Sequence, residues 1–85
     1  MNEINTKFCW FINDEFLNRL DEYKGSSLFY IGWAEAAFKR DCYWMFSCLM
    51  TNSGLDGEAA FEMMKKDKRT LDRLFEEAII EAEFA

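Results

Sequence analysis

The fold is decided by residues 28–50, LFYIGWAEAAFKRDCYWMFSCLM, which carry more apolar surface than any other part of the chain. The stretch holds two of the three tryptophans, three phenylalanines, two tyrosines and two of the three cysteines. At about 100° per residue, its apolar side chains fill a broad arc of a helical wheel. A helix that is apolar nearly all round must be covered on most sides. We therefore expect this helix at the centre of the protein.

One charged residue, Asp41, falls in the middle of the apolar arc. If the helix continues through residues 39–41, we expect the Asp41 carboxylate to form a buried ion pair with an Arg or Lys, because an unpaired buried charge is costly. If the helix breaks there, Asp41 is instead the N-cap of a second helix, a position that Asp often fills. The sequence leaves both alternatives open.

The flanking segments predict two or three further helices. A helix over residues 14–24 is expected, with Asn13 as its N-cap and Gly25 as its C-terminal stop. After a glycine-containing loop over residues 51–57, apolar residues recur at helical spacing almost to the end of the chain. This last region is either one helix or two helices joined near residues 65–70, with Asp67 or Thr70 as the cap of the second.

Residues 7–12, KFCWFI, are too short for periodicity to separate a strand from the first turn of a helix. We interpret them as weakly extended, and the alternative α+β fold pairs them with a strand over residues 28–33. The chain contains no proline and few glycines, which favours helix. The predicted fold class is mainly α: one domain over residues 1–85, built as a compact bundle of three to four helices.

The composition indicates a protein whose surface carries aromatic side chains. Of the 85 residues, 51% are hydrophobic and 18% are aromatic. A chain of this size buries only about 60–65% of its unfolded surface, so its core is limited. Trp and Tyr on a surface commonly anchor protein interfaces. The residues that we expect to bind a partner in this way are Trp10, Trp33, Tyr43 and Trp44.

The charge balance is acidic, with a formal net charge of -6 and a pI near 4.5. Free DNA and anionic membranes are therefore poor partners, and a basic protein surface is a better one. Four charged residues interrupt the apolar run at residues 28–50, so we do not expect it to span a membrane. The first residues lack the basic flank of a signal peptide, and the three cysteines show no CxxC spacing. We expect a cytoplasmic protein.

The sequence offers no recognisable catalytic constellation. It contains no histidine, no glycine-rich phosphate loop, and no Ser or Cys beside an evident base. Carboxylates on polar helix faces are usually solvated surface rather than catalytic or metal-binding groups. We therefore expect a non-enzymatic protein that uses no cofactor and no metal.

Two charged groups of residues are candidate interaction surfaces. Half of the positive charges lie within nine residues, where they could contact the phosphate backbone of RNA or DNA, although interleaved acidic residues favour a salt-bridged helix surface. This basic segment consists of Lys65, Lys66, Lys68, Arg69 and Arg73. The acidic residues expected to dock on a basic groove are Asp56, Glu58, Glu62, Glu76, Glu77 and Glu81.

In size, acidity, aromatic content and lack of catalytic residues, the chain resembles small acidic proteins that bacteriophages make against host defence or host machinery. The resemblance covers no aligned motif and transfers no named residue. It implies an inhibitor or antitoxin-like protein, acting in the cytoplasm of a bacterial host on a basic protein such as a nuclease. The alternatives are a binding protein that uses the basic segment to contact nucleic acid, and a helical homodimer with a structural or adaptor role.

Overall fold

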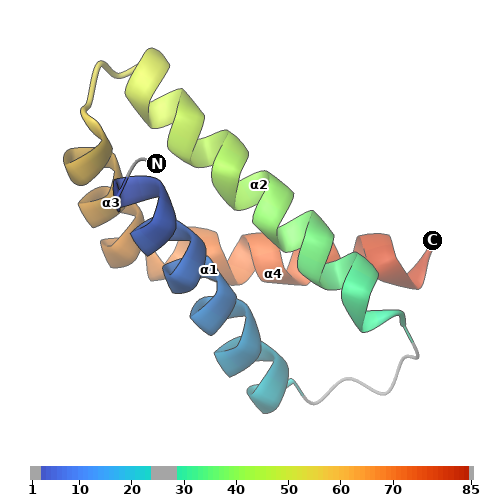
Figure 1. The fold of residues 1–85 in the computed structure, drawn as a ribbon. Helices are drawn as coiled ribbons and strands as arrows, with labels where there is room; N and C mark the ends of the chain where they lie inside the picture. Colours follow the sequence, from blue (N-terminus) through green and yellow to red (C-terminus); the bar gives the residue numbers. More distant parts are fainter. Residues whose placement is uncertain (1–2, 24–28, 85) are drawn as a thin grey trace.

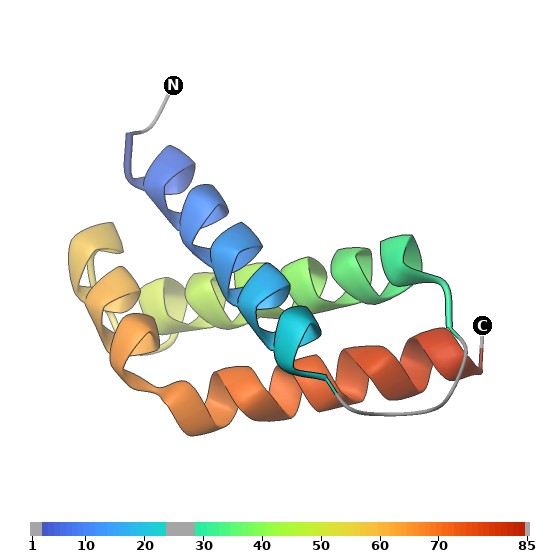
Figure 2. The same cartoon turned by 90° about the horizontal axis from the view of Figure 1, so that it is seen from below.

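The computed structural model describes residues 3–23 and 29–84, and within them the chain folds into four helices. These are α1 (Glu3–Glu22), α2 (Ile31–Thr51), α3 (Gly57–Lys66) and α4 (Lys68–Glu83). α4 runs back in roughly the opposite direction to α2 and crosses it obliquely, α1 lies across both, and the short α3 closes one end (Figure 1; Figure 2). The whole measures 40 × 23 × 21 Å. The prediction of a mainly α bundle of three to four helices is confirmed.

Residues 7–12 are helical, so the prediction that they are extended is wrong, as is the pairing with residues 28–33. Phe8 and Ile12 lie four residues apart and continue to Phe16, and all three side chains are fully buried. This i, i+4, i+8 stripe is typical of a helix that packs one face on a core. Asn13 is therefore inside α1 rather than at its N-cap. Gly25, the expected stop, lies outside the described residues.

α2 is one continuous helix, without a break at residues 39–41. It begins at Ile31, and Phe29 and Tyr30 before it are not in a strand, while residue 28 lies outside the described part of the chain. Its buried side chains are Ala34, Ala37, Phe38, Cys42 and Phe46. α2 packs most extensively against α4, and the rings of Phe38 and Phe46 belong to the core. The central position that the sequence predicted for this helix is confirmed.

The C-terminal region consists of two helices joined at a single residue, Asp67. Asp67 ends α3 and also caps α4, because its carboxylate accepts hydrogen bonds from the Thr70 backbone N–H at 3.2 Å and the Thr70 hydroxyl at 2.7 Å. These bonds to Thr70 lower the pKa of Asp67. Asp56 caps α3 in the same manner, accepting from the Ala59 N–H at 2.8 Å.

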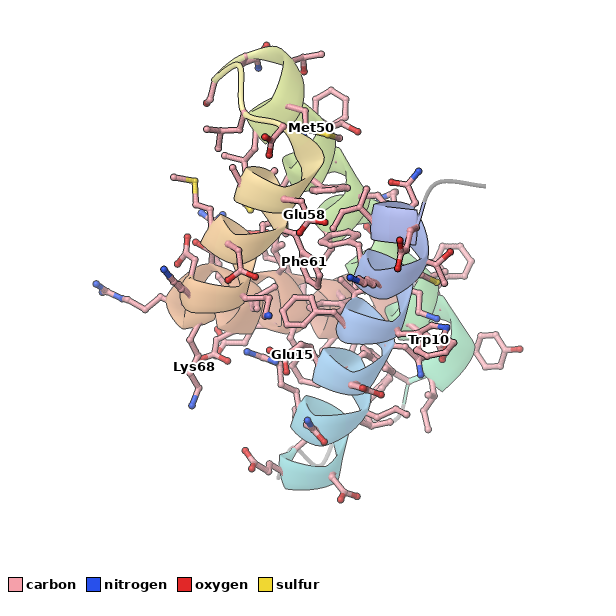
Figure 3. The ribbon with its side chains drawn as sticks, turned by 60° about the vertical axis from the view of Figure 1, so that its left-hand side comes forward. Trp10, Glu15, Met50, Glu58, Phe61 and Lys68 are labelled. Atoms are coloured by element: carbon pink, nitrogen blue, oxygen red, sulfur yellow. The ribbon has the colours of Figure 1, made fainter. Side chains whose placement is uncertain are left out.

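The core contains two groups of aromatic rings. Near the start of α1, the Phe8 ring stacks on Phe46 at 4.2 Å and contacts Phe61 edge-on at 5.9 Å. Figure 3 shows Phe61 pointing from α3 towards α1. Nearer the end of α1, the Phe16 ring lies 5.7 Å from Phe38 and 5.7 Å from Phe75. The two groups of rings connect α1 to the other three helices.

Every helix in the described part of the chain is too short or too polar to span a lipid bilayer.

Candidate functional site

The outer flanks of α2 and α4 form one continuous surface, which we call the α2–α4 face. It consists of Trp33, Arg40, Asp41 and Trp44 from α2 and Arg73, Glu77 and Glu81 from α4. On α2, Trp33, Arg40 and Trp44 are separated by seven and four residues, so they share one side of the helix. The face therefore combines two of the predicted aromatic residues with two of the predicted acidic residues.

Glu81 links the two helices at one end of this face. Its carboxylate accepts hydrogen bonds from the Trp33 indole N–H at 3.0 Å and from the Arg40 guanidinium at 2.9 and 3.2 Å. Arg40, and to a smaller extent Trp33, lower the pKa of Glu81. The indole of Trp33 is thereby held in one orientation while 47% of the residue remains exposed. A fixed and exposed Trp loses little conformational freedom when it enters an interface.

A hollow of ≈ 550 Å³ lies beside this network. Trp33, Arg40 and Glu81 line it together with Tyr30 and a floor of small residues, Gly32, Ala36 and Ala37. A Cβ at Gly32 would meet the Tyr30 ring at 3.2 Å, so the absence of a side chain lets the ring lie against the helix. The surface of the hollow is largely apolar.

Asp41 lies between the two ends of the face and is partly buried, with 29% of its side chain exposed. Its carboxylate pairs with the Arg40 guanidinium at 3.1 Å. The expected pairing is therefore present, but the expected burial is not, since Arg40 is 58% exposed. The pKa of Arg40 is raised by Glu81 and by Asp41. Because Asp41 sits on the edge of the buried arc next to α4, its charge reaches solvent without breaking the helix.

At the other end of the face, Trp44 is 72% exposed. It borders a second hollow of ≈ 380 Å³, whose lining includes Asp41, Arg73 and Glu77. Arg73 and Glu77 approach each other at 3.9 Å across one turn of α4. The face thus carries a tryptophan at each end and a band of mixed charge between them, with three carboxylates and two guanidinium groups.

The other two predicted aromatic residues lie elsewhere. Trp10 is 71% exposed on α1, beside Lys39 of α2 and on the side of α1 away from Phe61 (Figure 3). Tyr43 lies on the flank of α2 that faces α1, and its ring contacts the Phe8 ring edge-on at 5.2 Å. Burial raises the pKa of Tyr43 to about 12. Tyr43 therefore contacts the core through its ring while 37% of the residue remains exposed.

The predicted acidic residues do not form one patch. Asp56, Glu58 and Glu62 belong to α3, where Asp56 is the helix cap and Glu62 pairs with Lys65 at 3.4 Å. Glu77 and Glu81 lie on the α2–α4 face, as described above. Glu76 lies on the opposite flank of α4, next to Asp72 and Glu83. Docking through all six carboxylates at once is not compatible with this placement.

The basic segment surrounds the junction of α3 and α4. Lys65 pairs with Glu62 and lies 5.1 Å above the Phe61 ring, and Arg73 belongs to the α2–α4 face. Lys66, Lys68 and Arg69 are exposed, and no carboxylate in the described chain lies within 4.0 Å of them. The acidic end of α1 is close, since Glu15, Asp21 and Glu22 line the same hollow as Lys65 and Lys68.

Sequence reasoning missed the two arginines that join helices. Arg40 joins α2 to α4 through Glu81, and Arg19 joins α1 to α4 through Asp72 at 2.8 Å. Arg19 also pairs with Glu15 at 3.3 Å, and only 12% of its side chain is exposed. The spacing of Arg40 from Trp33 and Trp44 was a usable signal for its position. Nothing in the sequence identifies a partner 41 or 53 residues away.

The described residues contain no group of three or more Cys, Asp or Glu side chains arranged to hold a metal ion. The three cysteines are free thiols: Cys42 is buried, Cys48 is partly buried and Cys9 is exposed. Burial raises the pKa of Cys42 to about 12, so its thiol is protonated at neutral pH. Comparison of the chain with protein-family models, curated proteins and solved structures finds no match.

Proposed function

We propose that this protein is a small acidic inhibitor that docks through its α2–α4 face on a basic, nucleic-acid-handling protein of a bacterial host. The observation that carries the proposal is the pair of exposed tryptophans, Trp33 and Trp44, on one side of α2 beside the carboxylates of α4. Exposed Trp residues next to charged groups are the typical anchors of protein interfaces.

The preference for a basic partner comes from the charge of the molecule. The net charge of -6 attracts a cationic surface at long range and disfavours an anionic one. On the α2–α4 face itself the charges nearly balance, so the local ion pairs set orientation and the tryptophans supply most of the contact energy. A protein of this kind would block a nuclease or a related enzyme by occupying the groove that its nucleic acid uses.

Affinity capture from bacterial lysate with three forms of the protein tests this proposal. We expect the intact protein to capture a basic protein, and Trp33→Ala with Trp44→Ala to lose it. At about 2 kcal/mol for each interface Trp, the double variant should bind about 1,000-fold more weakly. Trp10→Ala is the control, because Trp10 is as exposed as Trp44 but lies on α1.

Equal capture by all three forms would show that the α2–α4 face is not the docking site. The purified partner should then be titrated at increasing salt concentration, because long-range attraction between the acidic protein and a basic partner weakens as ions screen it. Binding that does not change with salt would contradict the basic-partner part of the proposal.

Nucleic-acid binding is the second candidate function. It is favoured by the exposed side chains of Lys66, Lys68 and Arg69, which have no carboxylate within 4.0 Å among the residues that the structure describes. The nearby carboxylates of α1 and the net negative charge oppose it. Mobility-shift assays with RNA and DNA at low salt test whether the protein binds nucleic acid, because contacts to phosphate are strongest at low salt. A homodimer through α2 is the remaining alternative, and light scattering of the dilute protein distinguishes a dimer from a monomer.

A further inference from the structure

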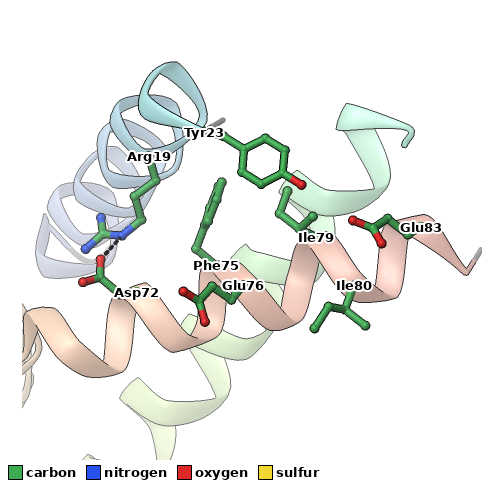
Figure 4. A pocket seen from close by; sticks show the side chains of 8 residues that line it. All are labelled: Arg19, Tyr23, Asp72, Phe75, Glu76, Ile79, Ile80 and Glu83. Atoms are coloured by element: carbon green, nitrogen blue, oxygen red, sulfur yellow. Dashed lines mark hydrogen bonds and ion pairs between the residues drawn. The ribbon is translucent and has the colours of Figure 1, made fainter. Parts of the chain in front are cut away.

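A groove of ≈ 430 Å³ lies on the flank of α4 opposite the α2–α4 face, between α4 and the end of α1 (Figure 4). Arg19 of α1 and Tyr23, which directly follows α1, border it on one side, and six side chains of α4 complete it. Its volume lies within the range of known ligand-binding pockets. The groove shares no lining residue with the two hollows of the α2–α4 face.

The floor of the groove is apolar. Phe75 and Ile79 form its buried base, the Tyr23 ring approaches the Phe75 ring at 6.2 Å, and Ile80 is 53% exposed at its edge (Figure 4). An apolar side chain placed here would remove part of Ile80 from water, which is favourable. The floor therefore selects an apolar group, whatever the charge of its surroundings.

The rim of the groove is acidic. Asp72 is already paired with Arg19, but Glu76 and Glu83 have no Lys or Arg within 4.0 Å in the part of the chain that the structure describes. Both carboxylates are exposed to solvent. An anionic ligand would be repelled, and a cationic one would gain two ion pairs.

The spacing of the acidic and apolar side chains on α4 indicates which sequence a complementary helix would need. Glu76, Ile80 and Glu83 follow one another at i, i+4 and i+7, so they form one stripe along the helix. At 1.5 Å per residue, the carboxylates stand about 6 Å and about 4.5 Å along the axis from Ile80. A complementary helix needs a large apolar residue with Lys or Arg three or four positions away on both sides.

We propose that this groove binds a basic amphipathic helix of the protein partner, with one apolar side chain on Phe75, Ile79 and Ile80 and basic residues on Glu76 and Glu83. The inference rests on the proposed function in requiring a basic protein partner, but it uses a separate surface. The protein would then contact its partner through two separate surfaces, the groove and the α2–α4 face, which lie on either side of α4.

The test uses two synthetic amphipathic helical peptides and NMR titration of the whole protein. The first peptide carries leucines on one face with lysines three and four positions away, and the second has glutamate in place of every lysine. We expect the lysine peptide to shift the methyl signals of Ile79 and Ile80 and the glutamate peptide to leave them unchanged. Signals of Trp33 and Trp44 report on the α2–α4 face in the same spectra.

Protein variants then test whether Glu76 and Glu83 bind the lysines of the peptide. Glu76→Gln with Glu83→Gln should weaken binding of the lysine peptide about fivefold, since two exposed ion pairs are lost. The matched control, Glu3→Gln with Glu58→Gln, changes the net charge equally but lies outside the groove. Ile80→Ser should weaken binding without unfolding the protein, because Ile80 is half exposed.

Three results would contradict the proposal that the groove binds a basic helix. They are equal binding of both peptides, NMR signal shifts confined to Trp33 and Trp44, and equal weakening of peptide binding by the Glu76/Glu83 variant and its control. These results do not depend on the capture experiment. If the peptide fails while capture still requires Trp33 and Trp44, the groove is excluded and the proposed function stands. If the peptide binds but capture does not require those tryptophans, the α2–α4 face is excluded instead.

Discussion

Asp67 is the residue on which the separation of α3 from α4 depends. It ends one helix and caps the next, and its carboxylate accepts both the N–H and the hydroxyl of Thr70. Asp67→Ala removes these acceptors and should lower the free energy of unfolding by about 1 kcal/mol. Asp67→Asn, which keeps a side-chain acceptor, should cost less. Urea denaturation followed by circular dichroism measures both.

The effect of Asp67→Ala should also depend on pH. The pKa of Asp67 is lower in the folded protein than its ordinary value of 3.8, so its charged form stabilises the fold above that pH. This contribution is lost as the pH falls through the folded pKa. The difference between the intact protein and Asp67→Ala should therefore be largest at neutral pH and shrink in acid. A difference that is constant with pH would mean that the charge of the cap is unimportant.

The positions of single residues show how much of the candidate site could be predicted from the sequence. The alignment of Trp33 and Trp44 along α2 is a consequence of helical spacing, and it was predictable. That Glu81 receives the Trp33 indole, while Trp10 and Tyr43 lie on other surfaces, depends on how the helices pack. The wheel placed Asp41 in the middle of the apolar arc, whereas the structure places it at the edge of the buried face, where its carboxylate reaches solvent.

At the level of secondary structure, mutations in the N-terminal half of α1 test whether residues 7–12 are helical or extended. Trp10→Pro should destabilise the protein by about 3 kcal/mol, because proline removes a backbone hydrogen bond and clashes with the preceding turn. Trp10→Ala should change stability by less than about 0.5 kcal/mol, since the side chain is 71% exposed. Thermal unfolding followed by circular dichroism compares them. Similar losses for both variants would argue against a helix at this position.

Helix α1 also shows why a short segment misleads. Within residues 7–12 alone, the apolar run fits a strand as well as a helix. The deciding residue, Phe16, lies outside that window and completes the stripe with Phe8 and Ile12. The central and C-terminal helices were predictable because their patterns extend over ten residues or more. The break after α3 was identified as an alternative from Asp67 and Thr70, and the structure selects Asp67.

For the molecule as a whole, stability depends on the ring cluster around Phe8. This ring is fully buried and contacts Phe11, Tyr43, Phe46 and Phe61. Phe8→Ala should cost about 3–5 kcal/mol, through lost burial and a residual cavity. A domain of this size has a total stability of roughly 4–13 kcal/mol, so the variant should be largely unfolded or strongly destabilised at 37 °C.

Phe84→Ala is the matched control, because it makes the same chemical change at a residue that is 83% exposed. It should leave the unfolding midpoint almost unchanged. If both variants unfolded at the same temperature as the intact protein, the aromatic core would not be the main source of stability.

The buried aromatic residues are all phenylalanines, and all three tryptophans are on the surface: Trp10 is 71%, Trp33 47% and Trp44 72% exposed. Tryptophan emission should therefore resemble that of the unfolded chain even in the native state, and unfolding should change it little. Occupation of the α2–α4 face would instead transfer two indoles out of water and shift their emission to shorter wavelength. Intrinsic fluorescence, normally a probe of folding, should in this protein report on the arrival of a partner.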